Sequence, residues 1–413
     1  MSATDGFVIV GASLAGAKAA QALREEGFAG PVVLIGEETE RPYERPPLSK
    51  EYLLGKSERD KIYVHPQSWY ADNDVDLRLG VRVTGLDPAA HEVTLADGSR
   101  VSYARLLLTT GSSPRSLPVP GADSDGVLHL RRVADSDRIK SVFQTASRIA
   151  VIGAGWIGLE TAAAARQAGV EVTILESAEL PLLRVLGPEV AAVFADLHRQ
   201  HGVGLRFGVQ VSEIVTAGGR VQGVRLADGG HVEADAVIMA VGIAPNTELA
   251  EAAGLETLDG VVVDAGLRSS DRDIYAAGDV ANAYHPVLAR HIRVEHWANA
   301  LHQPQAAARA MLDQDVSYDR VPYFFTDQYD LGMEYSGYVT PGHYDQVVFR
   351  GDVGQREFIA FWLEGGRVLA GMNVNVWDVN DAIQDLVRGG RPVEVARLTD
   401  PSVPLDQVAS GMS

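Results

Sequence analysis

The chain has 413 residues, of which 46% are hydrophobic and 22% charged, and its formal net charge is −19. This length predicts two or three domains, and the negative charge argues against general binding to nucleic-acid phosphates. Because the chain has no cysteine, disulfide exchange, sulfenate chemistry and cysteine-bound iron–sulfur clusters are excluded.

Nothing in the sequence predicts a membrane or secretory protein. No stretch approaches the roughly 20 apolar residues that span a bilayer, and the N-terminus lacks a basic segment followed by a cleavable apolar one. We therefore expect a cytoplasmic protein with no membrane or nucleic-acid partner. The histidines lack metal-ligand spacing, so we expect no metal site.

The first 40 residues predict a complete βαβ unit. Its elements are the strand Val8–Val10, the helix Ala15–Arg24 and the strand Val32–Ile35. Between the first strand and the helix lies a turn with Gly11, Ser13 and Gly16. Such a turn lets backbone N–H groups and a helix N-terminus approach a pyrophosphate. Ser13 stands where the middle glycine is expected, and it keeps the amide donor.

The segment that follows leads to a predicted domain crossing. Residues 41–70 are rich in proline and predict irregular structure, with Pro46-Pro47 heading a short helix. Val75–Leu108 predicts a small β-meander that ends in the buried strand Leu106–Leu108. A proline-rich loop follows Gly111, and we expect the chain to leave the first domain there.

The same plan then repeats. The strand Arg148–Ile152, the helix Gly158–Ala168 and the strand Glu171–Leu175 form a second βαβ unit, and Val203–Val237 predicts a second meander. Residues 150–242 thus repeat the plan of residues 8–111. The second turn has all three glycines, Gly153, Gly155 and Gly158.

The remaining sequence predicts a return to the first domain and then a third domain. Aromatic strands follow residue 321, and a helix is expected over Val379–Arg388. The predicted fold is α/β, with two Rossmann-like dinucleotide-binding domains for FAD and NAD and a C-terminal α+β domain. The predicted domains are 1–111 with 245–320 for FAD, 112–244 for NADH, and 321–413.

Two glycine turns predict two dinucleotides, and the commonest soluble pairing is a flavin with a nicotinamide. Glu37 and Glu176 each follow the second strand of a βαβ unit, where a carboxylate accepts hydrogen bonds from ribose hydroxyls. Glu176 would repel a 2′-phosphate, which favours NADH over NADPH. The alternative for either acid is a solvated side chain at a strand end.

The segment Arg41–Lys50, RPYERPPLSK, identifies a family. With the blocks at 155–160, 240–246, 275–279 and 295–300, it resembles FAD-dependent, NADH-using ferredoxin reductases of bacterial oxygenase and monooxygenase systems. These proteins are putidaredoxin reductase-like and related to apoptosis-inducing factor. The resemblance covers essentially the whole chain.

The resemblance implies a tightly bound, non-covalent FAD with Lys50 near flavin N5, paired with Glu160 as the catalytic residues. A cation there would stabilise negative charge on the reduced flavin. The residues it implies for FAD are Gly11, Ser13, Ala15, Gly16, Glu37, Arg45, Lys50, Val83, Thr110, Gly111, Arg131, Asp279, Glu295 and Trp297. Those for NADH are Gly153, Gly155, Trp156, Ile157, Gly158, Glu176, Arg184, Val241 and Gly242.

Each assignment has a structural alternative. Taken alone, Lys50 and Arg184 would be surface cations, Glu160 an acid on an amphipathic helix, and Trp297 a core residue.

The resemblance also implies the reaction and its partner. Hydride passes from NADH to flavin N5, and single electrons pass to a two-iron two-sulfur ferredoxin that feeds an oxygenase or haem-thiolate monooxygenase. A flavin is needed because it takes two electrons and releases them singly. Arg290, Arg293 and Arg309 are the predicted docking cations for an acidic ferredoxin. Phe325 stands where many relatives carry Trp, so a role that needs an indole N–H is not expected.

Two alternatives stay open at this stage. The sequence does not separate a ferredoxin from a rubredoxin as the acceptor. A different class is an NADH-sensing flavoprotein that recruits partners without significant turnover. We expect a monomer or weak dimer.

Overall fold

The structure is a computed structural model that describes residues 6–411, and the chain divides into two compact units. The first unit comprises Met1–Arg45, Arg59–Ser113 and Ile243–Arg320. The second comprises Pro46–Glu58, Pro114–Gly242 and Val321–Ser413. The division into three domains made from the sequence stays a prediction.

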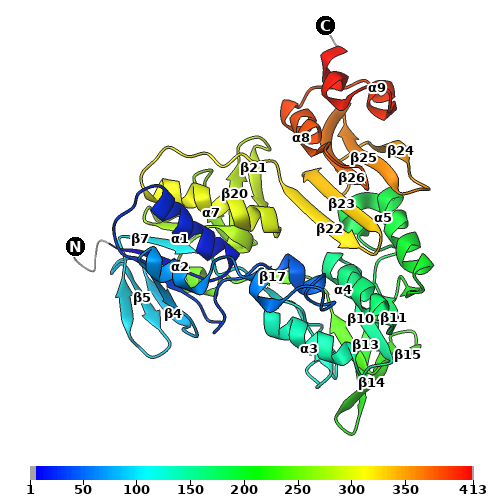
Figure 1. Ribbon diagram of the computed structural model, residues 1–413, viewed down its shortest axis with the longest axis horizontal. Coiled ribbons are helices and arrows are strands. Elements are labelled where there is room, and N and C mark those ends of the chain that lie inside the picture. The colour runs from blue at the N-terminus through cyan, green and yellow to red at the C-terminus, as the bar shows by residue number, and fades with distance from the viewer. Residues whose placement is uncertain (1–5, 412–413) are drawn as a thin grey trace. The chain divides into compact units, whose positions relative to one another are not determined.

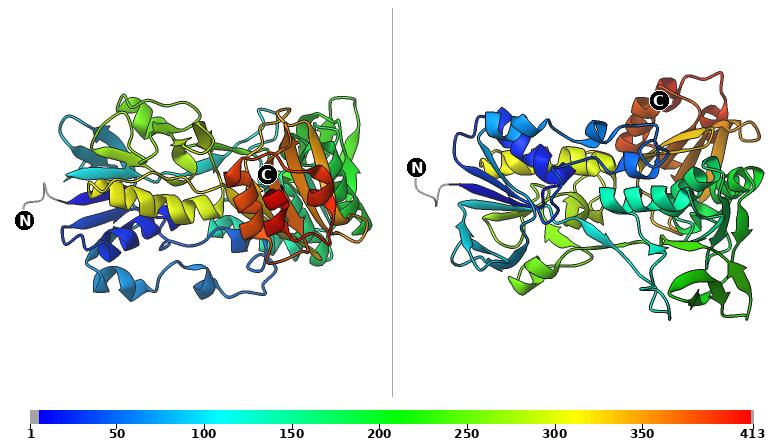
Figure 2. Two further views of the ribbon diagram at one scale, coloured as in Figure 1. Left: turned by 90° about the horizontal axis from the view of Figure 1, so that it is seen from above. Right: turned by 60° about the horizontal axis from the view of Figure 1, so that its bottom comes forward.

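A five-stranded parallel sheet forms the centre of the first unit (Figure 1). Its strand order is β19-β7-β1-β2-β3, with β1 (Phe7–Val10), β2 (Val32–Ile35), β3 (Val75–Arg78), β7 (Arg105–Leu108) and β19 (Ile274–Ala276). Every residue of β1 is buried, as expected for a parallel strand covered on both faces. Helices α1 (Leu14–Glu25) and α7 (Trp297–Met311) lie side by side (Figure 2).

Smaller elements complete this unit. One antiparallel sheet has β4 (Val83–Asp87), β5 (Glu92–Leu95) and β6 (Arg100–Ser102), and another sheet has β18 (Val261–Val263), β20 (Ala281–His285) and β21 (Arg290–Arg293). β8 (Ser112–Pro114) pairs with β17 (Ile243–Pro245). The short helices are α2 (Gln67–Asp72), α6 (Glu248–Ala252), η3 (Arg59–Ile62) and η4 (Gly278–Val280).

The second unit repeats the parallel sheet. Its order is β12-β11-β10-β16-β9, with β9 (Val127–Leu128), β10 (Arg148–Ile152), β11 (Glu171–Leu175), β12 (Gly204–Arg206) and β16 (Ala236–Met239). Its helices are η2 (Pro46–Ser49), α3 (Val133–Phe143), α4 (Trp156–Gln167) and α5 (Leu183–Gln200). The meander has β13 (Val211–Ala217), β14 (Arg220–Leu226) and β15 (His231–Glu233).

The two predicted meanders were too long. β3, β7, β12 and the start of β16 were assigned to them from the sequence, but all four strands belong to the parallel sheets, with β3 and β12 at an edge. The pairing of the strands shows this. Val75 of β3 pairs with Val32 of β2, and Gly204 of β12 pairs with Thr173 of β11. A short strand gives no sequence signal of which sheet it will join.

An antiparallel sheet forms the C-terminal part of the second unit. Its order is β22-β23-β26-β25-β24, with β22 (Tyr323–Gln328), β23 (Leu331–Gly337), β24 (Gln346–Asp352), β25 (Glu357–Glu364) and β26 (Arg367–Val374). Helices α8 (Asn380–Gly389) and α9 (Val395–Thr399) pack on this sheet (Figure 2), and η5 (Leu405–Gly411) follows. The predicted fold class, α/β with a C-terminal α+β part, is confirmed.

Over residues 6–411, no helix combines the length and the apolar character that a membrane span requires.

Candidate functional site

Lys50 and Glu160 form a buried ion pair in the second unit. Lys50 follows η2, and its Nζ lies 2.8 Å from Oε1 of Glu160 on α4. The side chain of Lys50 is 10% exposed and that of Glu160 is 5% exposed. An ion pair at this depth is a costly arrangement unless further hydrogen bonds support it. The structure therefore places the predicted catalytic pair in contact, although 110 residues separate its members.

Two hydroxyl groups complete the surroundings of Glu160. Ser49 Oγ donates to Oε2, and Thr326 Oγ1 on β22 donates to Oε1 at 2.5 Å. Lys50 also lies over the ring of Phe325, with 5.4 Å between Nζ and the ring centroid. The aromatic ring thus keeps a role beside Lys50 without an indole N–H.

The second glycine turn joins β10 to α4. Its three positions differ in whether the fold itself requires glycine. Gly153 has a φ of +99°, and a Cβ there would lie 2.3 Å from the carbonyl oxygen of Ala240. A Cβ on Gly158 would lie 2.1 Å from the carbonyl oxygen of Gly153. Packing of the chain itself therefore requires these two glycines.

Gly155 differs, because nothing in the chain requires it. Its φ of −78° and ψ of −177° suit any residue, and a Cβ there would meet nothing within 4 Å. It is the N-cap of α4, which has no side-chain cap and no acid in its first turn. The N-terminus of α4 is thus left open toward a bound anion.

The predicted ribose ligand Glu176 is held against this turn. Its Oε2 accepts from the backbone N–H of Ala154 at 2.7 Å, and its Oε1 accepts from that of Ala178 at 2.9 Å. Oε1 also accepts from Ser177 Oγ at 3.1 Å, so Oε2 is the oxygen that retains a lone pair for a ribose hydroxyl. The backbone nitrogen of Val241 also lies beside Gly153, whereas Gly242 and Arg184 are exposed.

Trp156 and Ile157 occupy the first turn of α4, where the side chain of Trp156 packs against the core and that of Ile157 is exposed. Trp156 packs against Phe194 and Phe324, with ring centroids 5.5 and 5.1 Å away. Its indole therefore belongs to the core of the second unit, which leaves its backbone for a nucleotide. Ile157 is 42% exposed.

The first glycine turn lies in the first unit and is equally tight. A Cβ on Gly11 would lie 2.1 Å from the carbonyl oxygen of Thr109, and one on Gly16 would lie 2.0 Å from that of Gly11. Ser13 is the N-cap of α1, yet its side chain caps nothing. It instead accepts a hydrogen bond from Arg45 at 3.3 Å. As in α4, the first turn of α1 contains no acid.

A second group of predicted residues gathers beside this turn. Gly278 has a φ of +79°, and a Cβ there would lie 3.2 Å from that of Ala15. The adjacent Asp279 accepts from Ser112 Oγ at 2.8 Å. Ser112, which sequence reasoning missed, comes directly after the predicted Gly111.

Thr110 and Gly111 are held in place by a residue that was also missed. Asn246 donates from Nδ2 to the carbonyl of Thr110 at 2.8 Å and from its backbone N–H to the carbonyl of Gly111. Thr110 Oγ1 in turn donates to the carbonyl of Asn246. The one signal in the sequence that pointed to Asn246 is that it lies in the block at 240–246.

Trp297 and Glu295 lie at the start of α7. Trp297 Nε1 donates to Oε2 of Glu44 at 3.2 Å, which places Glu44 beside the start of this helix. Glu295 is paired with Arg293, and partial burial raises the pKa of Glu295 against the opposing effect of that arginine. The Arg293 side chain is only 10% exposed and also pairs with Asp259. Its prediction as a docking cation was wrong, because burial and two acids already engage its charge.

The remaining predicted residues fall in both units. Val83 packs against the core of the first unit, and Glu37 is exposed after β2. The neighbouring acid Glu38 pairs with Arg45 at 3.7 Å. Arg131 lies in the second unit, where its backbone N–H donates to Asp135 at the start of α3. The first unit therefore gathers every predicted FAD residue except Lys50 and Arg131, and the second unit gathers the predicted NADH residues.

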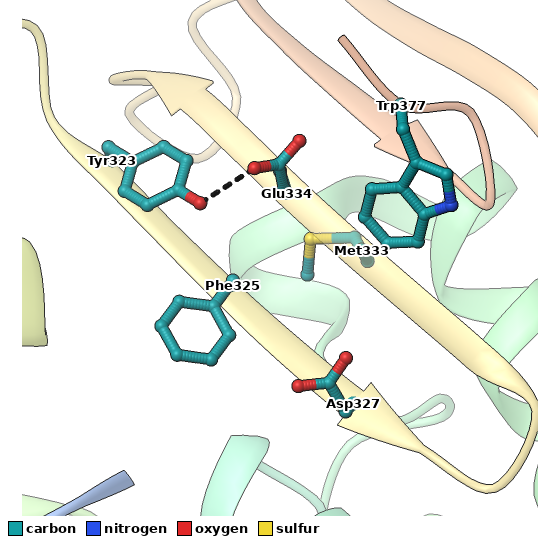
Figure 3. A pocket seen from close by; sticks show the side chains of 6 residues that line it. All are labelled: Tyr323, Phe325, Asp327, Met333, Glu334 and Trp377. Carbon is teal, nitrogen blue, oxygen red and sulfur yellow. Dashed lines mark hydrogen bonds between the residues drawn. The ribbon is translucent and has the colours of Figure 1, made fainter.

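An open pocket of about 270 Å³ lies on the exposed face of β22 and β23 (Figure 3). The aromatic residues that line it are Tyr323, Phe325 and Trp377. The hydroxyl group of Tyr323 donates to Oε1 of Glu334 at 2.8 Å. Asp327 completes the β22 side. Partial burial raises the pKa of its carboxyl, with Lys50 opposing the rise and Glu160 adding to it. The pocket contains none of the predicted site residues.

Comparison with known proteins decides the family. The sequence model described as pyridine nucleotide-disulphide oxidoreductase matches residues 6–304, and the one described as reductase C-terminal matches residues 323–409. The chain belongs to the pyridine nucleotide-disulphide oxidoreductase family. It is an oxidoreductase without a cysteine, so the disulphide of the family's name has no counterpart here.

Individual relatives match over nearly the full chain. The ferredoxin–NAD(+) reductase component of the anthranilate 1,2-dioxygenase system of Burkholderia cepacia is 41% identical, over 97% of this chain and 98% of the relative. Putidaredoxin reductase of Pseudomonas putida is 38% identical, over 99% and 97%. A solved structure, a covalent putidaredoxin reductase–putidaredoxin complex, aligns with a TM-score of 0.94 at 37% identity and covers 99% of both chains.

FAD and NADH are the cofactors of this oxidoreductase, and its residues fit them. In both units an uncapped helix N-terminus without an acid follows a glycine turn. By contrast, α3 has a capping box with Asp135. A helix whose first N–H groups lack side-chain partners favours a bound phosphate. The open position at Gly155 adds the space that a pyrophosphate needs.

Proposed function

We propose that this chain is an FAD-dependent NADH:ferredoxin oxidoreductase that passes single electrons to a two-iron two-sulfur ferredoxin. That ferredoxin would feed an oxygenase or a haem-thiolate monooxygenase. The observation that carries the proposal is the buried Lys50–Glu160 pair in a chain that has two open glycine-turn helices and no cysteine. Full-length relatives named as ferredoxin and putidaredoxin reductases support it.

The second unit would hold NADH. The N-terminus of α4 faces the pyrophosphate, with Gly155 leaving room for it, and Glu176 accepts from the adenosine ribose. Because its carboxylate is fixed by two backbone N–H groups, Glu176 cannot turn away from a 2′-phosphate without losing them. This supports a preference for NADH.

The first unit would hold most of the FAD. The N-terminus of α1, with Arg45 across it, faces the pyrophosphate, while Asp279 and Thr110 line the ribityl side and Trp297 covers the flavin edge. FAD supplies, when bound, a two-electron acceptor that releases electrons singly. Lys50 holds positive charge at the reacting edge, and Glu160 limits the cost of burying that charge.

Three further points are part of the proposal. The domains divide at 111/112, 244/245 and 320/321, the protein works in the cytoplasm, and it is a monomer or weak dimer. Arg290 and Arg309 remain the proposed docking cations. The side chain of Arg309 is 48% exposed and lies 3.8 Å from Glu26, an arrangement that contributes little to stability and leaves the guanidinium accessible.

Stopped-flow absorbance tests the proposal. NADH should bleach the flavin of the purified protein, and a two-iron ferredoxin from the same organism should restore the oxidised spectrum. Rubredoxin in a parallel syringe separates the two acceptors. If NADH bleaches the flavin but every two-iron ferredoxin of that organism leaves it reduced, the partner assignment is wrong.

A further inference from the structure

The two faces of β22 have different neighbours. Tyr323, Phe325 and Asp327 line the exposed pocket, whereas Thr326 and Gln328, which alternate with them, point into the core and are each 1% exposed. Two polar side chains in the core of a sheet are costly unless each finds a partner. Their partners form a chain of hydrogen bonds that ends at the Lys50–Glu160 pair.

That chain runs through three hydrogen bonds. Thr326 Oγ1 lies 2.5 Å from Glu160 Oε1, Gln328 Nε2 lies 3.2 Å from Thr326 Oγ1, and Gln328 Oε1 lies 2.8 Å from Nε2 of His198 on α5. It therefore connects α4, β22 and α5 within the second unit.

The direction of donation is fixed along the whole chain. The carboxylate of Glu160 only accepts, so the single proton of Thr326 is donated to it, and the Thr326 oxygen must accept from the amide nitrogen of Gln328. The amide oxygen of Gln328 then faces His198, which must donate from Nε2–H. Nδ1 of His198 has no partner among the described residues, which suits the Nε2–H tautomer. Burial lowers the pKa of His198 to about 4, so the ring is neutral at physiological pH.

Solvent does not substitute for these bonds, because His198 is fully buried. Replacing Gln328 with an apolar residue would leave the Nε2–H of His198 unsatisfied and would remove the hydrogen bond that the Thr326 oxygen accepts, so the hydroxyl that donates to Glu160 would be held less firmly. An amide does not relay protons under these conditions, so the chain holds groups in place and does not conduct protons.

A second acid explains why Glu160 must be held. Asp327 also interacts electrostatically with Lys50, and its carboxylate is on the exposed face of β22. Two carboxylates therefore compete for one ammonium group. A Glu160 fixed by Ser49, Thr326 and the residues behind Thr326 keeps Lys50 in its buried position.

We propose that Thr326, Gln328 and His198 are positioning residues that fix the Glu160 carboxylate and, through it, the ammonium group of Lys50. The relevance of this network to hydride transfer rests on the proposed function, in which Lys50 lies against the flavin. The network itself does not depend on that function. It also gives the C-terminal sheet a role in the reaction through β22.

The test observes Lys50 directly. The chain has only five lysines, at positions 18, 50, 56, 61 and 140, so nitrogen-15-labelled lysine gives at most five lysine ammonium signals in the NMR spectrum of the purified protein. Lys50→Met identifies the signal of Lys50. A buried, paired ammonium exchanges its protons slowly with water, and this signal should persist where exposed lysines lose theirs.

Thr326→Val removes the hydroxyl group at similar shape, and Gln328→Met removes the amide one step further away. Both should shift the Lys50 signal and speed its proton exchange about tenfold, whereas Thr326→Ser should restore it. Ser336→Ala is the matched control, because it deletes a buried hydroxyl of the neighbouring strand β23 that bonds Asn380 instead. In single turnover with NADH, the rate of flavin bleaching should fall about tenfold in Thr326→Val and recover in Thr326→Ser.

If only one of Thr326→Val and Gln328→Met folds, the Lys50 signal of that variant decides the test. An unchanged Lys50 signal in that variant, or an equal change in Ser336→Ala, would overturn the proposal. The NMR measurement uses neither NADH nor ferredoxin. Loss of the proposed function would therefore leave the Lys50 signal and its response intact, and the two failures can be told apart.

Discussion

Gly155 offers the sharpest separation between a residue that the fold needs and one that the cofactor needs. Its backbone suits alanine, and a new methyl group would meet no atom of the chain within 4 Å. Gly155→Ala should therefore change the free energy of unfolding by less than about 1 kcal/mol. The methyl group would, however, fill the space that we assign to the pyrophosphate of NADH.

The expected loss of binding follows from the cost of overpacking. Forcing a methyl group into a close contact costs about 1–3 kcal/mol, which corresponds to a rise of about 5- to 150-fold in the dissociation constant of NADH. The dependence of flavin bleaching on NADH concentration in an anaerobic stopped-flow instrument measures that constant. Thermal unfolding of the same samples measures stability.

Two other glycines provide matched controls. Gly158→Ala should destabilise the protein strongly, because its Cβ would lie 2.1 Å from a backbone oxygen that cannot move aside. Gly389→Ala, at the end of α8, meets nothing within 4 Å; it should leave NADH binding unchanged and change the free energy of unfolding by no more than about 1 kcal/mol. A Gly155→Ala protein that binds NADH as tightly as the parent would refute the assignment of the α4 N-terminus to the pyrophosphate.

Two further changes test the charge assignments. Glu176→Gln removes the repulsion toward a 2′-phosphate while an amide oxygen can still accept from Ala154, so the ratio of NADPH to NADH affinity should rise about tenfold; an unchanged ratio in parallel titrations would contradict the role of Glu176. His198 is neutral in the fold. Burial lowers its pKa from 6.5 to about 4, against the hydrogen bond that His198 donates to Gln328, which raises the pKa, while His201 lowers it further. Between pH 6.5 and 4 the unfolded chain binds the extra proton, so the free energy of unfolding falls with falling pH by an amount on the order of 3 kcal/mol. His198→Gln should remove that part of the pH dependence in denaturant titrations, and equal slopes for both proteins would show that His198 is not buried neutral.

Local patterns were enough to predict the two nucleotide-binding units. The strands β1 and β10 are short apolar runs that lead directly into glycine turns, and both helices begin within a residue or two of the predicted position. The reason is that a strand, a turn and a helix N-terminus depend on neighbours in sequence. The edge strands β3 and β12 were misassigned because joining a sheet depends on distant residues.

For the candidate site, too, features set by neighbouring residues could be predicted, and contacts between residues distant in the sequence could not. The pairing of Lys50 with Glu160 came from the resemblance to a family, since nothing in their spacing indicates contact. Thr326, Gln328 and His198 were not predicted, because their contacts depend on which face of β22 is buried and on the packing of α5 against that face. On β22 the alternation of faces decides that Thr326 points toward α4 and Phe325 away from it, and a strand that is aromatic on both faces does not reveal which face is buried.

The stoichiometry of electron transfer tests the central claim most directly. With catalytic amounts of the protein and no oxygen, each NADH oxidised should reduce two molecules of a two-iron ferredoxin, because the donor gives two electrons and each acceptor takes one. Absorbance at the nicotinamide and ferredoxin bands follows both in one cuvette. NADH oxidation that leaves the ferredoxin oxidised, or that requires an added thiol, would contradict the account.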